Sequence, residues 1–461
     1  MNQTAPAAAP QLYPITSGQM MIYYTQKFCY KKQISNICAV VNIENDVDEA
    51  LLYQSVLLAA MRFPSMNCRI TNKDDKLMQY FVDTIPELIH TVDLSACSEQ
   101  EIDSTIDKWS AVPFPNKGMD VPLYRINILK MPGGKFALYF CVCHMIMDAY
   151  ALMGLTTYIS QIYAALRDGT AFPVLKKTPM ECYMSGFSYF TSEKYQKDQA
   201  WWKELFKTEP TFTSMNGTTG RDYVKDKKYG VVLRSWKVTA DHLNLRIPKE
   251  IVEMVNSLAE QYMVSPHTVY LVAMRAYLSA VCGTEDVTFM DTVARRSTLV
   301  QKHAGGTMVN AIPLRTTFSN DMSLGDTLVQ MFRTQRETYR HADVPCGQIL
   351  QMIKQIHNPP VGMVNHNYTS VSLTYQPYFI YDESAFRCTF QRRKSGAAAT
   401  PLYLSIMPID NSGDFWVNYE YLTDLVRRDS LEKSHAFMLN FVRYGFKNPD
   451  STVADLMKKS L

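Results

Sequence analysis

The sequence contains no long apolar run and no excess of charge of either sign. None of its apolar stretches reaches the roughly 18 residues that a membrane-spanning helix needs, so we expect no membrane span. Lys and Arg number 47 and Asp and Glu 44, which gives a formal net charge of +3. This balance gives no electrostatic reason to expect a nucleic-acid partner.

The beginning of the sequence also lacks the features of a secretory signal. Residues Met1–Pro10 have neither a basic start nor an apolar core, and a signal peptide requires both. We therefore expect residues 1–11 to be a disordered lead, and we expect the protein to be cytoplasmic.

The cysteines form neither a disulfide framework nor a metal-binding pattern. The 10 cysteines are scattered, and without a secretory signal we expect them to be reduced and mostly buried. Cys141, Cys143 and His144 are close in sequence, but on a strand the two cysteines share one face and the histidine lies on the other. No second ligand pair follows at metal-site spacing, so we expect no metal. The same geometry argues against Cys143 as a nucleophile, because the adjacent ring cannot easily activate its thiol.

The length and composition predict two lobes. A chain of 461 residues with 47% hydrophobic residues has ample material for packed cores but is too long for one ordinary core. Strands and helices alternate in both halves, which indicates an α/β fold. We place the first lobe at residues 12–177 and the second at 178–461, with Phe172–Pro179 as the linker between them.

Apolar periodicity predicts the individual elements. In the first half, helices are expected at Thr16–Phe28, Val47–Arg62, Glu99–Trp109 and Ala149–Leu166, and strands at Ile34–Ile43, Leu77–Phe81, Leu123–Lys130 and Lys135–His144. In the second half, helices are expected at Ser192–Phe206, Lys249–Tyr262, Ser265–Cys282, Ser323–Ala342 and Arg428–Tyr444. The expected strands there are Asp241–Pro248, Val287–Val293, Met308–Phe318, Tyr368–Tyr375, Pro401–Asp410 and Phe415–Tyr421, with a mobile polar loop at Thr208–Lys228.

The most informative segment surrounds His144. The eight residues Phe136–Cys143 are mostly apolar and predict a buried strand, and a helix with one apolar face follows and ends near Asp168. His144 and Asp148 therefore lie at a strand-to-helix junction. An imidazole suits proton transfer there, because it gains and loses a proton near neutral pH.

This pattern, His-x-x-x-Asp after a hydrophobic strand, resembles the His-His-x-x-x-Asp-Gly signature of the condensation-domain superfamily, the chloramphenicol-acetyltransferase-like acyltransferases. Six further segments resemble motifs of that family in the same order, from about residue 12 to about residue 457. They are Tyr13–Gln19, Arg62–Arg69, Val121–Leu129, Thr288–Arg296, Met308–Arg315 and His341–Pro345. The chain departs from the signature at two positions, with Cys143 in place of the first histidine and Ala149 in place of the glycine.

The resemblance implies a fold and a site. The fold would be α/β, with two chloramphenicol-acetyltransferase-like lobes in a V shape, mixed sheets with flanking helices, and a tunnel between the lobes. His144 would lie at the middle of the tunnel, and Asp148 would pair with Arg296 or Arg295 to hold the site together. The expected substrate-binding set is Asn310, Cys143 and Ala149, although an amide such as that of Asn310 more often ties neighbouring backbone groups.

The resemblance also implies the chemistry. It predicts transfer of an acyl group from a thioester, on CoA or on the phosphopantetheine of an acyl carrier protein, to a small alcohol or amine acceptor. His144 would be the general base, and no cofactor would be permanently bound. The sequence lacks a Gly-Gly-x-Ser attachment motif and ends at Leu461, which favours a free-standing enzyme. Two alternatives are a nonribosomal peptide synthetase condensation domain acting in trans and a degenerate, non-catalytic binding domain of the same fold.

Overall fold

The computed structural model describes residues 10–82, 89–115, 120–174, 186–219, 239–296, 298, 301–302, 304–357, 368, 371–376, 385–410 and 412–461. Most of the predicted lead, residues 1–9, and residues 175–179 of the predicted linker lie outside these ranges. Among the described residues, none of the helices is both long enough and apolar enough to cross a membrane.

The first lobe is built on a five-stranded mixed sheet in the order β12-β2-β7-β6-β5. Its strands are β2 (Asn36–Ile43), β5 (Ile89–Asp93), β6 (Tyr124–Met131), β7 (Lys135–Cys143) and β12 (Cys388–Arg393). Only β5 and β6 pair in parallel, and the other neighbours are antiparallel. A small separate sheet contains β1 (Tyr13–Pro14), β3 (Cys68–Lys73) and β4 (Lys76–Phe81).

The strand that leads to His144 is the central strand of this sheet, as its apolar sequence predicts. Every residue of β7 from Ala137 to Cys143 is buried. The strand is joined to β6 by the tight turn Pro132–Gly134, in which Gly133 and Gly134 both adopt a φ of +73°, a conformation that glycine adopts at little cost.

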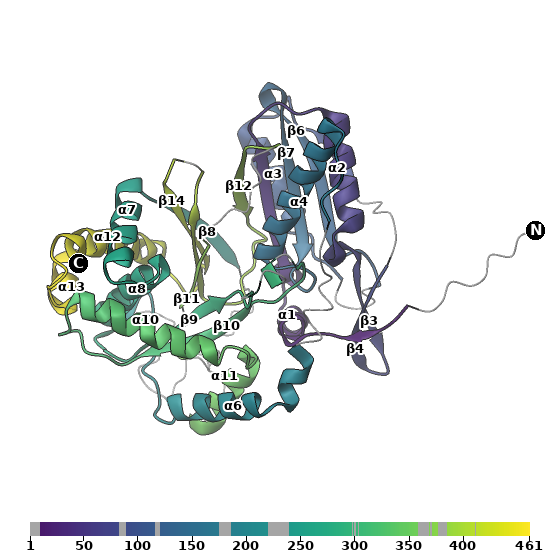
Figure 1. Ribbon diagram of the computed structural model, residues 1–461. Coiled ribbons are helices and arrows are strands. Elements are labelled where there is room, and N and C mark those ends of the chain that lie inside the picture. The colour runs from purple at the N-terminus through teal and green to yellow at the C-terminus, as the bar shows by residue number, and fades with distance from the viewer. Residues whose placement is uncertain are drawn as a thin grey trace, which may run out of the picture.

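Helices cover both faces of the first sheet. The helices of this lobe are α1 (Ser17–Phe28), α2 (Glu49–Arg62), α3 (Glu99–Ser110) and α4 (Ala149–Asp168). Figure 1 shows α2 and α4 side by side on one face, with α3 on the other. On the α3 face, the hydroxyls of Ser110 and Tyr139 lie 3.1 Å apart and the Trp109 ring packs 5.5 Å from the Tyr139 ring.

The second lobe is built on a six-stranded mixed sheet in the order β10-β9-β11-β13-β14-β8. Its strands are β8 (Ala240–Ile247), β9 (Val287–Val293), β10 (Asn310–Thr316), β11 (Val371–Tyr375), β13 (Leu402–Pro408) and β14 (Phe415–Leu422). Strand β11 runs parallel to both β9 and β13, and the remaining neighbours are antiparallel.

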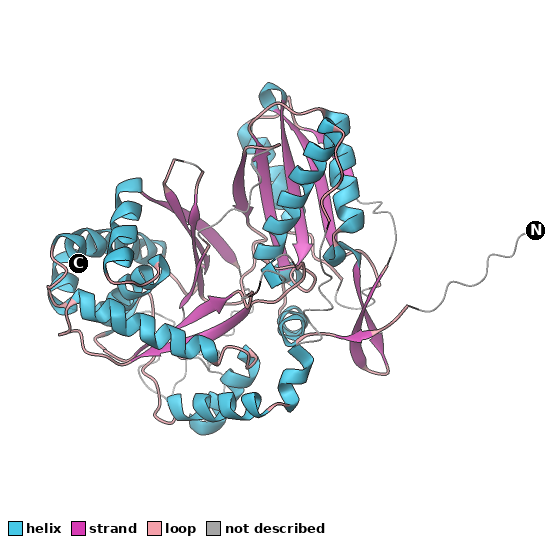
Figure 2. Cartoon of the chain, viewed as in Figure 1, coloured by secondary structure: helices cyan, strands magenta, loops and turns pink. Residues whose placement is uncertain are grey.

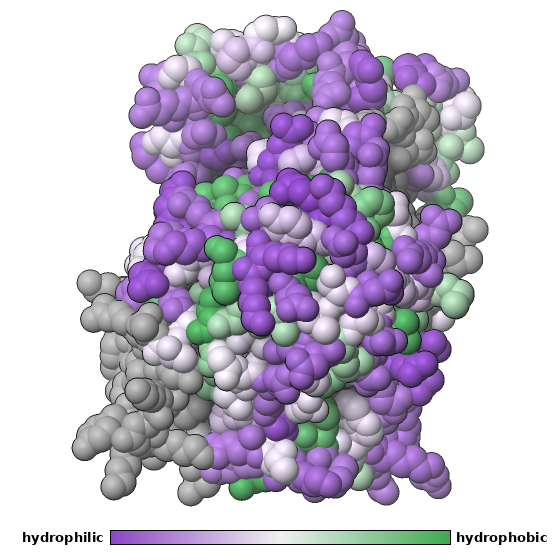
Figure 3. All heavy atoms as spheres, turned by 90° about the vertical axis from the view of Figure 1, so that its left-hand side faces the viewer, coloured by the Kyte–Doolittle hydropathy of each residue, from purple (hydrophilic) through white to green (hydrophobic). Residues whose placement is uncertain are grey.

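The helices of the second lobe lie mainly on one face of this sheet, and the other face is turned toward the first lobe (Figure 2). They are α6 (Glu193–Leu205), α7 (Lys249–Gln261), α8 (Pro266–Cys282), α10 (Leu324–Arg340), α11 (Cys346–His357), α12 (Arg428–Lys447) and α13 (Val453–Ser460). Helix α8 is buried along most of its length. The outer face in Figure 3 is mostly hydrophilic with scattered hydrophobic residues, as expected where amphipathic helices meet solvent.

One strand of the second half completes the first sheet. Strand β12 pairs antiparallel with β2 over six residues, from Cys388 opposite Ile43 to Arg393 opposite Cys38. Met147 and Gly306 form a further bridge between the two halves. The division at residues 177 and 178 did not anticipate this exchange, because a strand is assigned to a sheet by its partners and not by its place in the chain.

The predicted α/β fold with mixed sheets and flanking helices is confirmed, whereas the V shape and the tunnel stay predictions. Apolar periodicity did not predict β1, β3, β5, β12, α11 or α13. Strand β12 is mostly polar and only its last residue is buried, so it carries no apolar periodicity. Within the predicted mobile loop, Phe212–Asn216 is buried, and residues 220–228 lie outside the described ranges.

Candidate active site

His144 is the first residue after β7, and its backbone is held on both sides. Its amide donates to the carbonyl of Ser35 at 2.7 Å, and its carbonyl accepts from the hydroxyl of Thr307. The ring is only partly buried, while its Nδ1 atom is buried and has no hydrogen-bond partner among the described residues. Contacts from both halves of the chain therefore fix the position of an imidazole that keeps some exposed surface.

The surroundings of His144 favour the neutral imidazole. Burial is the main cause and lowers the pKa of the ring below its ordinary value. Asp148 and the residue's own carbonyl raise this pKa, and Arg392 lowers it. A neutral imidazole is the form that can accept a proton.

Both carboxylate oxygens of Asp148 accept hydrogen bonds. Asp148 is the N-cap of α4, where it accepts from the amide of Ala151 at 2.8 Å. It also accepts from the amide of Met308 at 3.0 Å, and the Nη2 atom of Arg296 lies 3.0 Å from both carboxylate oxygens. These contacts join three chain segments. Because Asp148 is 0% exposed, its carboxylate is not accessible to a substrate.

Of the two arginines that the resemblance offered, Arg296 pairs with Asp148. Arg296 also donates to the carbonyls of Gln301 at 2.7 Å and Gly306 at 3.0 Å, and to that of Ala304. It therefore holds the segment that carries Thr307 against the start of α4.

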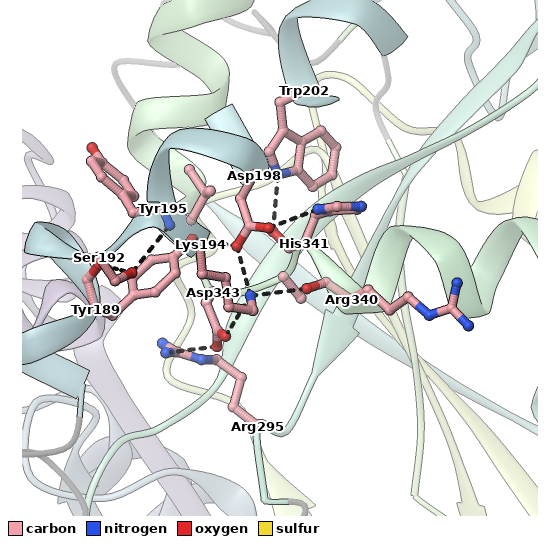
Figure 4. A network of polar contacts seen from close by, with 12 residues as sticks. Tyr189, Ser192, Lys194, Tyr195, Asp198, Trp202, Arg295, Arg340, His341 and Asp343 are labelled. Carbon is pink, nitrogen blue, oxygen red and sulfur yellow. Dashed lines mark hydrogen bonds and ion pairs between the residues drawn. The ribbon is translucent and has the colours of Figure 1, made fainter. Parts of the chain in front are cut away.

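Arg295 has a different partner. It adopts a φ of 53° and pairs with Asp343 at 3.1 Å. Figure 4 shows this pair within a network in which Lys194 contacts Asp343 at 3.2 Å and Asp198 at 2.7 Å. The ring of His341 contacts Asp198 at 2.8 Å. The network joins α6 to the chain segments after β9 and α10.

The structure does not support substrate contact by Cys143 or Asn310. Cys143 is 1% exposed and packs in the core of the first lobe. Asn310 is 5% exposed, and its amide donates to the carbonyls of Ala342 at 2.9 Å and Val344 at 2.8 Å and accepts from the amide of Cys346 at 3.1 Å. Since these bonds use both donors and the oxygen of the amide, Asn310 ties neighbouring backbone groups.

Ala149 is the first residue of α4 and is partly exposed. It is absent from the positions with positive φ, so its backbone does not need the conformational freedom of glycine. The departure from the family signature at this position is therefore compatible with ordinary helical geometry.

Arg392 reaches the site from β12 and was not among the predicted site residues. Its guanidinium pairs with Glu420 of β14 and lies 5.1 Å from the centre of the Tyr403 ring of β13. Since β12 was not predicted, no local signal marked this residue. Among the described residues, no group of three or more His, Cys, Asp or Glu side chains could hold a metal ion.

The protein belongs to the class of α/β proteins with two mixed sheets and a His-x-x-x-Asp junction, in which both halves of the chain hold the backbone of the histidine. A family model described as Condensation domain matches residues 9–459, and the chain belongs to this family. It is 22% identical over 452 residues to surfactin synthase subunit 1 of Bacillus subtilis (strain 168), covering 96% of this chain and 12% of that protein. It is 20% identical over 462 residues to tyrocidine synthase 3 of Brevibacillus parabrevis, covering 98% and 7%. The chain thus spans about a tenth of the length of these relatives.

Solved condensation domains share the fold. The first condensation domain of the calcium-dependent antibiotic synthetase, in complex with a substrate analogue, matches with a TM-score of 0.80 and 19% identity over 96% of this chain and 98% of that chain. The starter condensation domain of rhizomide synthetase, in complex with C8-CoA, matches with a TM-score of 0.80 and 18% identity over 96% of both chains. At these identities the likeness concerns the fold alone.

Proposed function

We propose that this condensation-family protein transfers an acyl group from a thioester to an amine or alcohol, with His144 as the general base. The observation that carries the proposal is the state of His144. Its backbone is fixed from both halves of the chain, its ring is partly exposed, and burial favours its neutral form.

The donor in this proposal is a thioester of CoA or of phosphopantetheine on a carrier protein. The family resemblance favours this class, and one protein of similar fold was solved with C8-CoA. No permanently bound cofactor is needed, because the thioester itself supplies the activated acyl group.

The base contributes by removing the proton of the acceptor as it attacks the thioester carbonyl. A positioned general base contributes about 10²–10⁴ in rate, which corresponds to about 3–5 kcal/mol of transition-state stabilisation. Asp148 and Arg296 act through structure, because their contacts hold the start of α4 and the segment carrying Thr307 on either side of His144.

The test is a thiol-release assay on the purified protein with acyl-CoA and carrier-bound donors and with simple amines and alcohols. Replacing His144 by alanine should lower kcat by roughly 100-fold or more without unfolding the protein. The matched control is Cys143→Ser, which changes a buried neighbour on the other face of the strand and should retain activity. Full turnover by His144→Ala would refute the assignment of the base.

The same assay separates the alternatives. Release from carrier-bound donors alone would favour a peptide-synthetase condensation domain acting in trans. If no donor and acceptor pair gives thiol release in the presence of the wild-type protein, the catalytic proposal fails and a non-catalytic binding domain is favoured.

A further inference from the structure

A row of four charged or thiol side chains crosses the first sheet on the face opposite His144. Arg125 of β6 lies opposite Cys141 of β7, Cys141 lies opposite Cys38 of β2, and Cys38 lies opposite Arg393 of β12. Residues directly opposite each other on neighbouring strands have side chains on the same face. The order across the sheet is therefore arginine, cysteine, cysteine, arginine.

The two thiols are close enough to react with each other. The Sγ atom of Cys38 lies 3.5 Å from that of Cys141. His144 donates its amide to Ser35, so Ser35 and His144 form a hydrogen-bonded pair of the antiparallel ladder. The pairs alternate along the ladder, so Cys38 and Cys141, three positions away, form a non-hydrogen-bonded pair. Such pairs have Cα atoms about 4.5 Å apart, within the range of about 4.4–6.8 Å found for disulfides.

The two arginines differ in how their charge is balanced. Arg393 pairs with Asp103 at 2.7 Å and Asp107 at 3.2 Å. The described contacts of Arg125 are the carbonyl of Val112, the Sγ atom of Cys141 at 3.3 Å and the ring of Phe114 at 4.4 Å. None of these is a carboxylate, so a thiolate at Cys141 would be the nearest counter-charge in this group of contacts.

Two buried polar atoms near the thiols also lack partners among the described residues. They are Nε of Arg125 and Oδ1 of Asn36. Asn36 donates from its other amide atom to the carbonyls of Ser110 and Val112, and Ser110 also lies against Cys38. One donor and one acceptor near the thiol pair are therefore buried without a partner among the described residues, while Cys38 is 3% and Cys141 0% exposed.

We propose that Cys141 and Cys38 form a redox-active dithiol that hydrogen peroxide converts into a cross-strand disulfide. Cys141 is the attacking thiol, because the hydrogen bond from Cys38 and the charge of Arg125 lower its pKa against the opposing effect of burial. Cys38 is the resolving thiol, whose pKa is raised by its hydrogen bond to Cys141 and by burial.

The reaction balances with peroxide as the oxidant. The thiolate of Cys141 attacks one peroxide oxygen, the O–O bond breaks, and the leaving hydroxide takes a proton to form water. The sulfur of Cys38 then attacks the resulting sulfenic acid, the S–S bond forms, and the S–O bond breaks to release a second water. Two thiols are oxidised and one peroxide is reduced to two waters.

The test treats the full-length protein with hydrogen peroxide at neutral pH and maps its peptides by mass spectrometry. The expected product has lost two hydrogen atoms, links the Cys38 and Cys141 peptides, and reverts with dithiothreitol. In Cys38→Ser, dimedone should trap a sulfenic acid on Cys141. Cys68 is the internal control, because burial raises the pKa of its thiol to about 12, and it should stay reduced.

The role of Arg125 is tested by a matched pair of variants. Arg125→Gln should slow disulfide formation roughly fivefold or more, since it removes the charge that favours the thiolate, and Arg125→Lys should restore most of the rate. Arg393→Gln should have less effect, because the charge of Arg393 is already balanced. The proposal is overturned if Cys141 is oxidised no faster than Cys68, or if oxidation yields no link between Cys141 and Cys38.

Discussion

Replacing Asp148 by asparagine would remove the negative charge from a carboxylate that is 0% exposed, while the side chain of its partner Arg296 is 1% exposed. The guanidinium would then be buried without a counter-charge. If the amide nitrogen of the asparagine took the place of Oδ2, its N–H groups would face the donors of Met308 and Arg296, both of which lie 3.0 Å from that oxygen. Removing one partner of a buried ion pair typically costs about 3–5 kcal/mol.

This cost is large compared with the roughly 5–15 kcal/mol that holds a typical protein folded. We therefore expect Asp148→Asn to lower the free energy of unfolding by about 3–5 kcal/mol and to reduce the soluble yield. Urea unfolding followed by circular dichroism measures the change. The control is Arg295→Gln, whose ion pair with Asp343 is 25% and 41% exposed and should contribute only about 0.2–1 kcal/mol.

Two results would contradict this reasoning. If Asp148→Asn unfolds within about 1 kcal/mol of the wild type, a range typical of exposed pairs, the carboxylate does not hold the three segments together. If the variant is fully stable but inactive, Asp148 acts directly in the chemistry. The double variant Asp148→Asn with Arg296→Gln should cost less than the sum of the single changes, because it leaves no charge unpaired.

Three further predictions concern the same region and the pH response. If His144 is the base, kcat/KM should be constant at neutral pH and fall as the pH drops below about 6.5. Arg392→Gln should move this fall in kcat/KM to higher pH, because Arg392 lowers the pKa of His144. An unchanged pH profile would argue against the proximity of the two residues. A Cβ at Gly305 would lie 2.1 Å from the hydroxyl of Ser65, so Gly305→Ala should lower the free energy of unfolding in urea by about 1–3 kcal/mol. Ser65→Gly should restore part of this loss, and no restoration would show that the loss comes from the backbone conformation and not from the clash. Burial lowers the pKa of His435, so as the pH falls the unfolded chain binds a proton at this histidine before the folded chain does. The free energy of unfolding should therefore be highest above about pH 6.5 and decline below it. The decline should be smaller in His435→Gln, and an equal decline in both proteins would exclude His435 as its cause.

Much of the candidate site could be predicted from local sequence. The apolar run before His144 requires a buried central strand, and the helical period after Asp148 requires a helix that begins there. The spacing of the two residues places both at the junction. Arg296 was identified through a later family motif, since nothing near it in the sequence indicates a buried carboxylate as its partner.

Other features depend on segments that are far apart in the chain. Arg392 reaches the surroundings of His144 only because β12 pairs with β2. The same pairing brings Arg393 beside Cys38 and completes the row of arginines and cysteines. Strand β12 is mostly polar, so it forms through its hydrogen-bonded neighbours and not through an apolar pattern of its own.

The sequence by itself determined which residue types stand at the strand-to-helix junction, because apolar periodicity and helix capping act over a few neighbouring residues. The tertiary structure decided which polar groups are hydrogen-bonded or buried within the protein. Asn310 is hydrogen-bonded to the backbone of residues 342–346, and Cys143 is packed in the core. Burial and hydrogen bonding are properties of the whole packed chain, and they distinguish the partly exposed His144 from the buried Cys143 and Asn310.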